Sequence, residues 1–239
     1  RTPELLALGN EDLVAATCRS DGDDILEEVL EATEASMVAE ITEADCWARC
    51  RHSEDWPDGL LDGADAPRCL IGRGDSIRLG EVSTGASVTV VGARRATSYG
   101  LEMARSISHE LSAAGLLVVS GMALGIDGAA HRGALEAGPT VAVLGCGVDR
   151  PYPVSHTRLY RNIVESGLVI SEFPPGTQPW KWTFPARNRI MAALSQMTVV
   201  VEAARRSGSL ITAEMAADAG REVGAVPGQV TSLAAGGTN

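Results

Sequence analysis

Six short apolar runs recur between residues 87 and 228, and their alternation with helical stretches constrains the fold more than any other feature. The runs are SVTVVG (87–92), LLVVSG (116–121), TVAVLG (140–145), LVISE (168–172), MTVVVE (197–202) and EVGAVPG (222–228). Most are separated by stretches with helical spacing of apolar residues, such as YGLEMARSISHELSAAG. Fully apolar strands that alternate with helices are typical of a parallel sheet covered on both faces. We therefore predict an α/β fold with a parallel, or mostly parallel, sheet.

The first 85 residues differ from the rest of the chain in charge and in the spacing of their apolar residues. Residues 1–45 are acidic, and DDILEEVLEATEASMVAEI within them has the apolar spacing of an amphipathic helix. Residues 45–85 are rich in Pro, Gly and Asp, which predicts turns around one short strand near 68–72. We expect residues 1–54 to form a small acidic helical domain, or part of one, and residues 55–239 to form the core.

The net charge of −11 is distributed unevenly, so it does not exclude a nucleic-acid partner. Residues 1–85 carry seven basic and 20 acidic residues, a net charge of −13, whereas residues 86–239 carry 13 basic and 11 acidic residues, a net charge of +2. The second part can therefore present a local basic face.

Hydropathy and cysteine content indicate a cytoplasmic protein. No apolar run approaches the roughly 20 residues that span a bilayer, and the first residues lack the apolar core of a secretory signal. We expect no membrane partner. Five cysteines (18, 46, 50, 69 and 146) are an odd and sparse set, which fits a reducing compartment better than a disulfide framework.

The densest aromatic cluster holds the single lysine of the chain. Within PWKWTFPARNRI, residues 179–190, Trp180, Trp182 and Phe184 surround Lys181, and two arginines follow. Rings stack on bases and cations pair with phosphates, so this composition suits single-stranded nucleic acid. The alternative is a loop whose rings cover a sheet edge and whose charges are solvated.

Several loops that follow the predicted strands carry anion-binding chemistry. Gly92 lets backbone approach a ligand, and Arg94 can donate two hydrogen bonds to a phosphate. A glycine turn (121, 125, 128) precedes a helix expected near Ile126, and RRSGS (205–209) precedes another. The aromatic loop is expected to close on a helix opened by residues 187–188. A single arginine in such a loop is often only structural. The carboxyl ends of parallel strands lie at the same end of the sheet, however, so these loops are expected to lie close together. Together the loops predict a phosphorylated or polyanionic ligand.

Other candidate sites have simpler explanations. Asp127 and His131 share a helical face, but a local hydrogen bond or cap explains them better than catalysis because no third orienting group is evident. Cys146 between two glycines fits a crowded turn as well as a reactive thiol. The spacing of Cys46, Cys50 and His52 does not suit zinc, and we expect no metal. The chain has neither GxGxxG nor GxxxxGK[ST], so no nucleotide cofactor is expected.

Seven segments taken together resemble the DNA-processing protein A family (DprA, also called Smf). They occur in the family's order over roughly residues 55–239: VVGARRATSYG, VVSGMALGIDGAAHRGAL, TVAVLGCGVDRPYP, SEFPPG, FPARNRI, VVVEAARRSGSLITA and GREVGAVPG. The resemblance implies an extended Rossmann-like domain that binds single-stranded DNA without being an enzyme. It also implies a homodimer that protects incoming DNA and helps to load a RecA-type recombinase in natural transformation.

The resemblance and the loop chemistry select one set of residues. By motif, Arg94 matches the family's phosphate-binding arginine, while Lys181 and Phe184 match a basic residue and an aromatic that contacts bases. The full set expected to bind DNA is Gly92, Arg94, Ser120, Gly121, Gly125, Lys181, Phe184, Arg187, Asn188, Ser207, Gly208 and Ser209. Ala93 stands where many members carry serine, and ending at GGTN implies that a C-terminal winged-helix domain is absent.

Two other functions remain open from the sequence. A Rossmann-like fold can host a nucleotide N-glycoside hydrolase, for which Glu172 or Glu202 at strand ends would supply the carboxylate. A protein scaffold that docks partners through its acidic first helices is the second alternative, although such a charged stretch is more often a solvated face.

Overall fold

The computed structural model describes residues 34–61, 65–83 and 87–239, and the chain divides into two compact units, 1–43 and 44–239. In the first unit, helix α4 (Glu34–Glu43) forms where the sequence predicts an amphipathic helix. The remainder of the predicted acidic helical segment lies outside the described residues.

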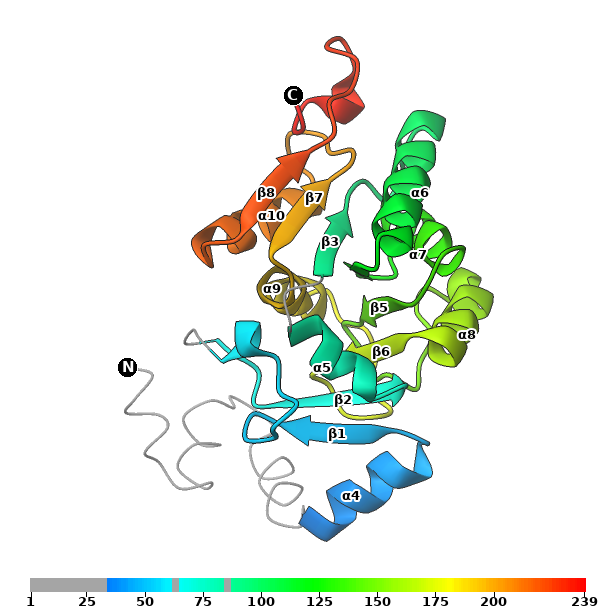
Figure 1. The fold of residues 1–239 in the computed structure, drawn as a ribbon, viewed down its shortest axis with the longest axis vertical. Helices are drawn as coiled ribbons and strands as arrows, with labels where there is room; N and C mark the ends of the chain where they lie inside the picture. Colours follow the sequence, from blue (N-terminus) through cyan, green and yellow to red (C-terminus); the bar gives the residue numbers. More distant parts are fainter. Residues whose placement is uncertain (1–33, 62–64, 84–86) are drawn as a thin grey trace. The chain divides into compact units, whose positions relative to one another are not determined.

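The second unit contains one eight-stranded sheet (Figure 1). The strands are β1 (Trp47–Cys50), β2 (Cys69–Gly74), β3 (Ser87–Val91), β4 (Leu117–Ser120), β5 (Thr140–Val143), β6 (Leu168–Ser171), β7 (Met197–Val200) and β8 (Glu222–Ala225). They are ordered β1-β2-β6-β5-β4-β3-β7-β8. The six strands β3 to β8 pair in parallel, and β2 joins them and β1 in antiparallel pairs. Each of the six apolar runs forms a strand, which confirms the predicted α/β class.

Helices cover both faces of this sheet, as the fully apolar strands require. They are α5 (Ile77–Ser83), α6 (Ser98–Ala113), α7 (Ile126–Leu135), α8 (Thr157–Ser166), α9 (Thr183–Leu194) and α10 (Gly208–Asp218). Figure 1 shows α6, α7 and α8 on one side and α9 and α10 on the other. Side chains along β3 alternate between the two faces of the sheet. Val88 and Val90 pack with α6 and α7, while Val91 packs on the other face with α5, α9 and α10.

The segment between α4 and β3 contains more regular structure than the sequence indicates. The predicted strand near 68–72 is β2, but β1 and α5 were not predicted. β1 is fixed by tertiary contacts: the indole of Trp47 lies against Gly72, where a Cβ would come within 2.1 Å of the ring, and its N–H donates to the carbonyl of Gly74 at 3.1 Å. A four-residue strand held by one ring carries no periodic signal.

The strand order reverses beside β3. The chain runs outward through β3, β4, β5 and β6, then crosses back to place β7 and β8 on the other side of β3. Loops that leave the carboxyl ends of β3 and β7 therefore turn to opposite faces of the sheet. Such a switch point leaves a crevice in which open α/β sheets bind their ligands.

Candidate nucleic-acid interface

A cleft of about 730 Å³ occupies this switch point. Its walls come from the loop after β3, the loop after β7 with the start of α10, and the first turns of α9. Nine of the twelve predicted site residues line it: Gly92, Arg94, Lys181, Phe184, Arg187, Asn188, Ser207, Gly208 and Ser209. Segments more than 100 residues apart in sequence thus meet in one concave surface, as the strand-end rule predicts.

Arg94 and two aromatic rings form a stack at the cleft. The guanidinium carbon of Arg94 lies 5.2 Å from the ring centroid of Phe184, and the ring of Tyr152 lies 5.6 Å from Phe184 at a tilt of 36°. Both distances are within the range of cation–π and aromatic pairing. The stack fixes the direction of the exposed Arg94 side chain, and it presents a cation beside two ring faces.

The cations of the cleft are available to an external anion. Within the described residues, Arg94, Arg95 and Lys181 form no ion pair with a carboxylate, and all three are exposed on the cleft wall. Exposed arginines elsewhere, such as Arg105 with Glu136, do form such pairs. Unpaired cations gathered in a concave surface attract a polyanion.

Two tryptophans extend the aromatic surface next to Lys181. The side chains of Trp180 and Trp182 are 59% and 63% exposed, which is unusual for large apolar rings. Trp182 makes an edge-to-face contact with Phe173, with ring centroids 5.6 Å apart. Exposed rings beside a cation are the composition that single-stranded nucleic-acid sites use for base stacking.

The N-terminus of α10 lies at the cleft wall and can attract an anion. Ser207 is its N-cap: the hydroxyl lies 2.7 Å from the Ser209 hydroxyl and accepts from the Ser209 amide at 3.4 Å. Helix N-termini favour anions because their first amides lack partners and the helix dipole is positive there. The predicted serine-glycine segment thus lies at the cleft wall, where the amides of Ser209 and Leu210 already bond to Ser207 and the helix dipole still favours an anion.

Arg187 has a different place from the one expected. Helix α9 begins at Thr183, not at residues 187–188, because Pro185 falls in the first turn, where its missing amide has no cost. Arg187 therefore lies one turn inside the helix and is 4% exposed. Its guanidinium donates to the carbonyl of Gly121 at 2.7 Å and also to that of Val143. The side chain joins the ends of β4 and β5 beneath the cleft.

A buried carboxyl accompanies this arginine. Burial lowers the pKa of Arg187 to about 10, and burial raises the pKa of Asp127, which the nearby Arg187 charge opposes. Asp127 accepts a hydrogen bond from the amide of Ala123 at 3.3 Å. The floor of the cleft thus holds Asp127 and Arg187 near enough to influence each other's pKa, while the exposed cations lie at its walls.

Three predicted residues lie behind the cleft wall. Ser120 is fully buried and donates to the carbonyl of Val90 at 2.6 Å. A Cβ on Gly121 would come within 2.3 Å of the Arg187 guanidinium. Gly125 has a φ of +79°, and a Cβ there would come within 2.2 Å of the carbonyl oxygen of Ala93. These residues shape the loop that carries Arg94.

Sequence reasoning missed Arg95 and Tyr152 as members of the cleft. Tyr152 follows β5 in the segment GVDRPYP, and its ring contacts Phe184 from a separate loop. The available signal was an aromatic residue in a strand-end loop, the same signal that selected Phe184.

The carboxylates required by the hydrolase alternative are engaged elsewhere. Both oxygens of Glu172 accept from Arg189 at 2.7 Å. Glu202 is buried and accepts from the amide of Thr97 at 3.0 Å and from its hydroxyl. Neither residue lines the cleft.

Asp127 and His131 share a face of α7 but bond to different partners. His131 pairs with the hydroxyl of Thr140 at 2.8 Å, whereas Asp127 bonds to Ala123. In the part of the chain that the structure describes, no three metal-ligating side chains gather, and no helix is long and apolar enough to cross a bilayer.

Comparison with known proteins identifies what this site is similar to. The sequence model of the family described as DNA recombination-mediator protein A matches residues 47–239. The chain is 39% identical to the DNA processing protein DprA of Bacillus subtilis over 186 residues, which are 77% of this chain and 62% of that protein. It is 49% identical to a putative DNA processing protein DprA of Mycobacterium tuberculosis over 161 residues, 67% of this chain and 41% of that protein. The chain therefore spans only part of these relatives.

Two solved structures share the architecture. The X-ray structure of DNA processing protein A from Streptococcus pneumoniae superposes with a TM-score of 0.81 at 35% identity, over 97% of this chain and 80% of that one. The protein from Helicobacter pylori superposes with a TM-score of 0.71 at 29% identity, over 78% of this chain and 82% of that one. The latter structure concerns a single-stranded DNA binding mode.

Proposed function

The chain belongs to the DNA recombination-mediator protein A family, and from this premise we propose that it binds single-stranded DNA in the cleft between the ends of β3 and β7. The observation that carries the proposal is the stack of Arg94, Phe184 and Tyr152 beside exposed cations that form no ion pair with a carboxylate of the described residues. The Helicobacter pylori relative, whose structure concerns single-stranded DNA, supports it.

The chemistry of the cleft assigns a role to each wall. Backbone phosphates meet Arg94, Arg95, Lys181 and the start of α10, since these groups donate hydrogen bonds and carry positive charge. Unpaired bases stack on Phe184 and continue toward Trp182. Duplex DNA keeps its bases stacked on one another, so it offers no free ring face to Phe184. The site therefore selects single strands with little sequence preference.

Family membership extends the proposal to the cellular role. We infer that the chain acts in the cytoplasm as a homodimer that protects single-stranded DNA and assists a RecA-type recombinase, without catalysing a reaction. The first unit, residues 1–43, would then be an accessory acidic domain, and residues 44–239, which include β1, would form the DNA-binding core.

Fluorescence anisotropy with labelled oligo-dT tests the binding site. The wild-type chain should bind the oligonucleotide and resist competition by duplex DNA. The double variant Lys181→Ala/Phe184→Ala should lose affinity by roughly tenfold to a hundredfold, since one lost base stack alone costs about 1–3 kcal/mol.

Arg158→Ala is the matched control, because this arginine is exposed on α8 and does not line the cleft. It should bind as the wild type does. Equal affinity of the double variant and the wild type would move the site elsewhere, and equal affinity for duplex and single strands would contradict the stacking mechanism.

A further inference from the structure

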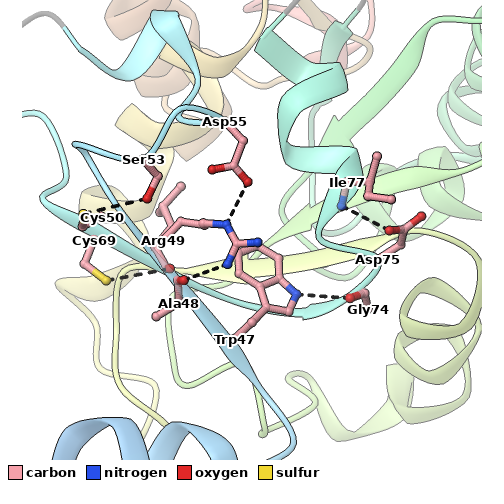
Figure 2. A network of polar contacts seen from close by, with 11 residues as sticks. Trp47, Ala48, Arg49, Cys50, Ser53, Asp55, Cys69, Gly74, Asp75 and Ile77 are labelled. Carbon is pink, nitrogen blue, oxygen red and sulfur yellow. Dashed lines mark hydrogen bonds and ion pairs between the residues drawn. The ribbon is translucent and has the colours of Figure 1, made fainter. Parts of the chain in front are cut away.

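Two cysteines lie opposite each other where β1 ends and β2 begins. Cys50, the last residue of β1, is the register partner of Cys69, the first residue of β2. The next pair along the ladder is joined by a hydrogen bond of 3.0 Å from the amide of Arg51 to the carbonyl of Arg68. Because bonded and non-bonded pairs alternate in antiparallel ladders, Cys50 and Cys69 form a non-hydrogen-bonded pair. Figure 2 shows them next to each other.

The backbone already holds this pair within disulfide reach. In a non-hydrogen-bonded pair the Cα atoms are about 4.5 Å apart and both side chains project from the same face. Disulfides form at Cα separations of about 4.4–6.8 Å. Both thiols are free in the structure, and the geometry of a non-hydrogen-bonded pair allows a bond between them through side-chain rotation.

The two thiols differ in reactivity. Cys50 is exposed, and its pKa is lowered by hydrogen bonds from the backbone of His52 and from Ser53, whose hydroxyl lies 3.8 Å from the sulfur. Cys69 is half-buried, and burial raises the pKa of its thiol. Since the thiolate is the reacting form, Cys50 is the attacking residue and Cys69 the resolving one.

The other described cysteines do not compete for this pairing. Cys46 lies four residues before Cys50, which is about 13 Å along an extended chain. Burial raises the pKa of Cys46, and it raises that of the buried Cys146 to about 11. Within the described residues no three metal-ligating side chains gather, so Cys50 and Cys69 are a dithiol and not part of a metal site.

We propose that Cys50 and Cys69 are a redox-modification site that closes reversibly to a disulfide when the chain meets a hydroperoxide. The Cys50 thiolate attacks the peroxide, so an S–O bond forms, the O–O bond breaks and the departing alkoxide takes a proton from water. The Cys69 thiol then attacks the Cys50 sulfur: the S–S bond forms, the S–O bond breaks, and hydroxide leaves with the thiol proton as water. Two thiols are oxidised and one hydroperoxide is reduced to an alcohol and water.

The bond would add a covalent closure to a segment that backbone hydrogen bonds and packed side chains already hold. It closes residues 51–68, in which Trp56 and Leu60 are buried in the core and Asp55 accepts from Arg49 at 2.8 Å (Figure 2). Arg49 in turn lies over the ring of Trp47, with its guanidinium carbon 5.4 Å from the centroid. Because Cys50 is exposed, a thiol reductant can reach and reopen the bond.

Stoichiometric hydrogen peroxide, followed by intact-mass measurement and non-reducing peptide mapping of the whole chain, tests the proposal. The wild type should lose two hydrogen masses, yield a peptide cross-linked through Cys50 and Cys69, and return to its starting mass with dithiothreitol. Cys69→Ser should instead stop at a sulfenic acid on Cys50 that dimedone traps, because the resolving thiol is gone.

Cys46→Ser is the matched control and should form the same cross-link as the wild type. Cross-links that join other cysteines, a wild-type Cys50 that gains oxygen without cross-linking, or a Cys50 that reacts no faster than Cys146 would each overturn the proposal.

Discussion

At the scale of single residues, the buried polar side chains of the core bond to other parts of the protein and support the fold. His131 is fully buried, its pKa is lowered to about 3 by burial, and it pairs with Thr140. Arg187 is likewise buried and joins two strand ends. The side chains proposed to contact DNA, such as Arg94, Lys181 and Phe184, lie on loops and in the first turn of α9.

His131 predicts a specific pH dependence of stability. Its folded pKa of about 3 is below the ordinary value of 6.5, so folding favours the neutral ring. The stability it contributes is complete above pH 6.5 and is lost as the pH falls toward 3, by about 1.4 kcal/mol per pH unit. Urea unfolding of the wild type and His131→Gln at several pH values measures the effect. The difference in free energy of unfolding between the wild type and His131→Gln should change with this slope below pH 6.5. The same pH dependence for both proteins would refute the assignment.

At the scale of elements, helix α6 depends on the carboxylate at the end of β7. Glu202 accepts from the amide and the hydroxyl of Thr97, the N-cap of α6, and a Cβ on Gly100 would come within 2.7 Å of this carboxylate. A glutamate at a strand end of a Rossmann-like fold is a candidate catalytic residue. Its contacts instead describe a structural support that joins β7 to the first turn of α6.

Glu202→Ala should therefore act on stability. The substitution removes a buried acceptor of two hydrogen bonds from Thr97 and leaves a space beside Gly100, so the free energy of unfolding should fall by about 1–3 kcal/mol in chemical denaturation. Glu136→Ala removes an exposed carboxylate that pairs with Arg105 and should cost less than about 1 kcal/mol. Equal effects of the two substitutions would contradict the role given to Glu202.

The sequence allowed prediction of the strands that are continuous apolar runs. Strands β3 to β8 are such runs, and α7 begins at Ile126, where the glycine turn predicts a helix. β1 escaped prediction because the ring of Trp47 on Gly72 holds it, a contact between segments 25 residues apart. The burial of Arg187 could not be foreseen either, because it depends on where Pro185 lets α9 begin.

At the scale of the whole molecule, the acidic excess lies in residues 1–85 of the sequence, whereas the cleft is lined by residues 91–234. Arg94, Arg95 and Lys181 line the cleft, and the exposed Arg205 and Arg206 precede α10. Three to five phosphates neutralised by these groups would give a log–log slope of affinity against salt of about −2 to −3.5 for a single strand. Anisotropy titrations with oligo-dT across a range of salt concentrations measure this slope. A slope near zero would mean that phosphates do not meet these cations.

The central claim, that single-stranded DNA occupies the cleft, is tested most directly by photocrosslinking. An oligo-dT that carries 5-iododeoxyuridine is bound to the chain and irradiated, and the adducts are located by mass spectrometry. We predict adducts on Phe184, Tyr152 and Trp182, whose rings lie in or beside the cleft. Adducts confined to Trp47 and Tyr99, which do not line the cleft, would contradict the claim.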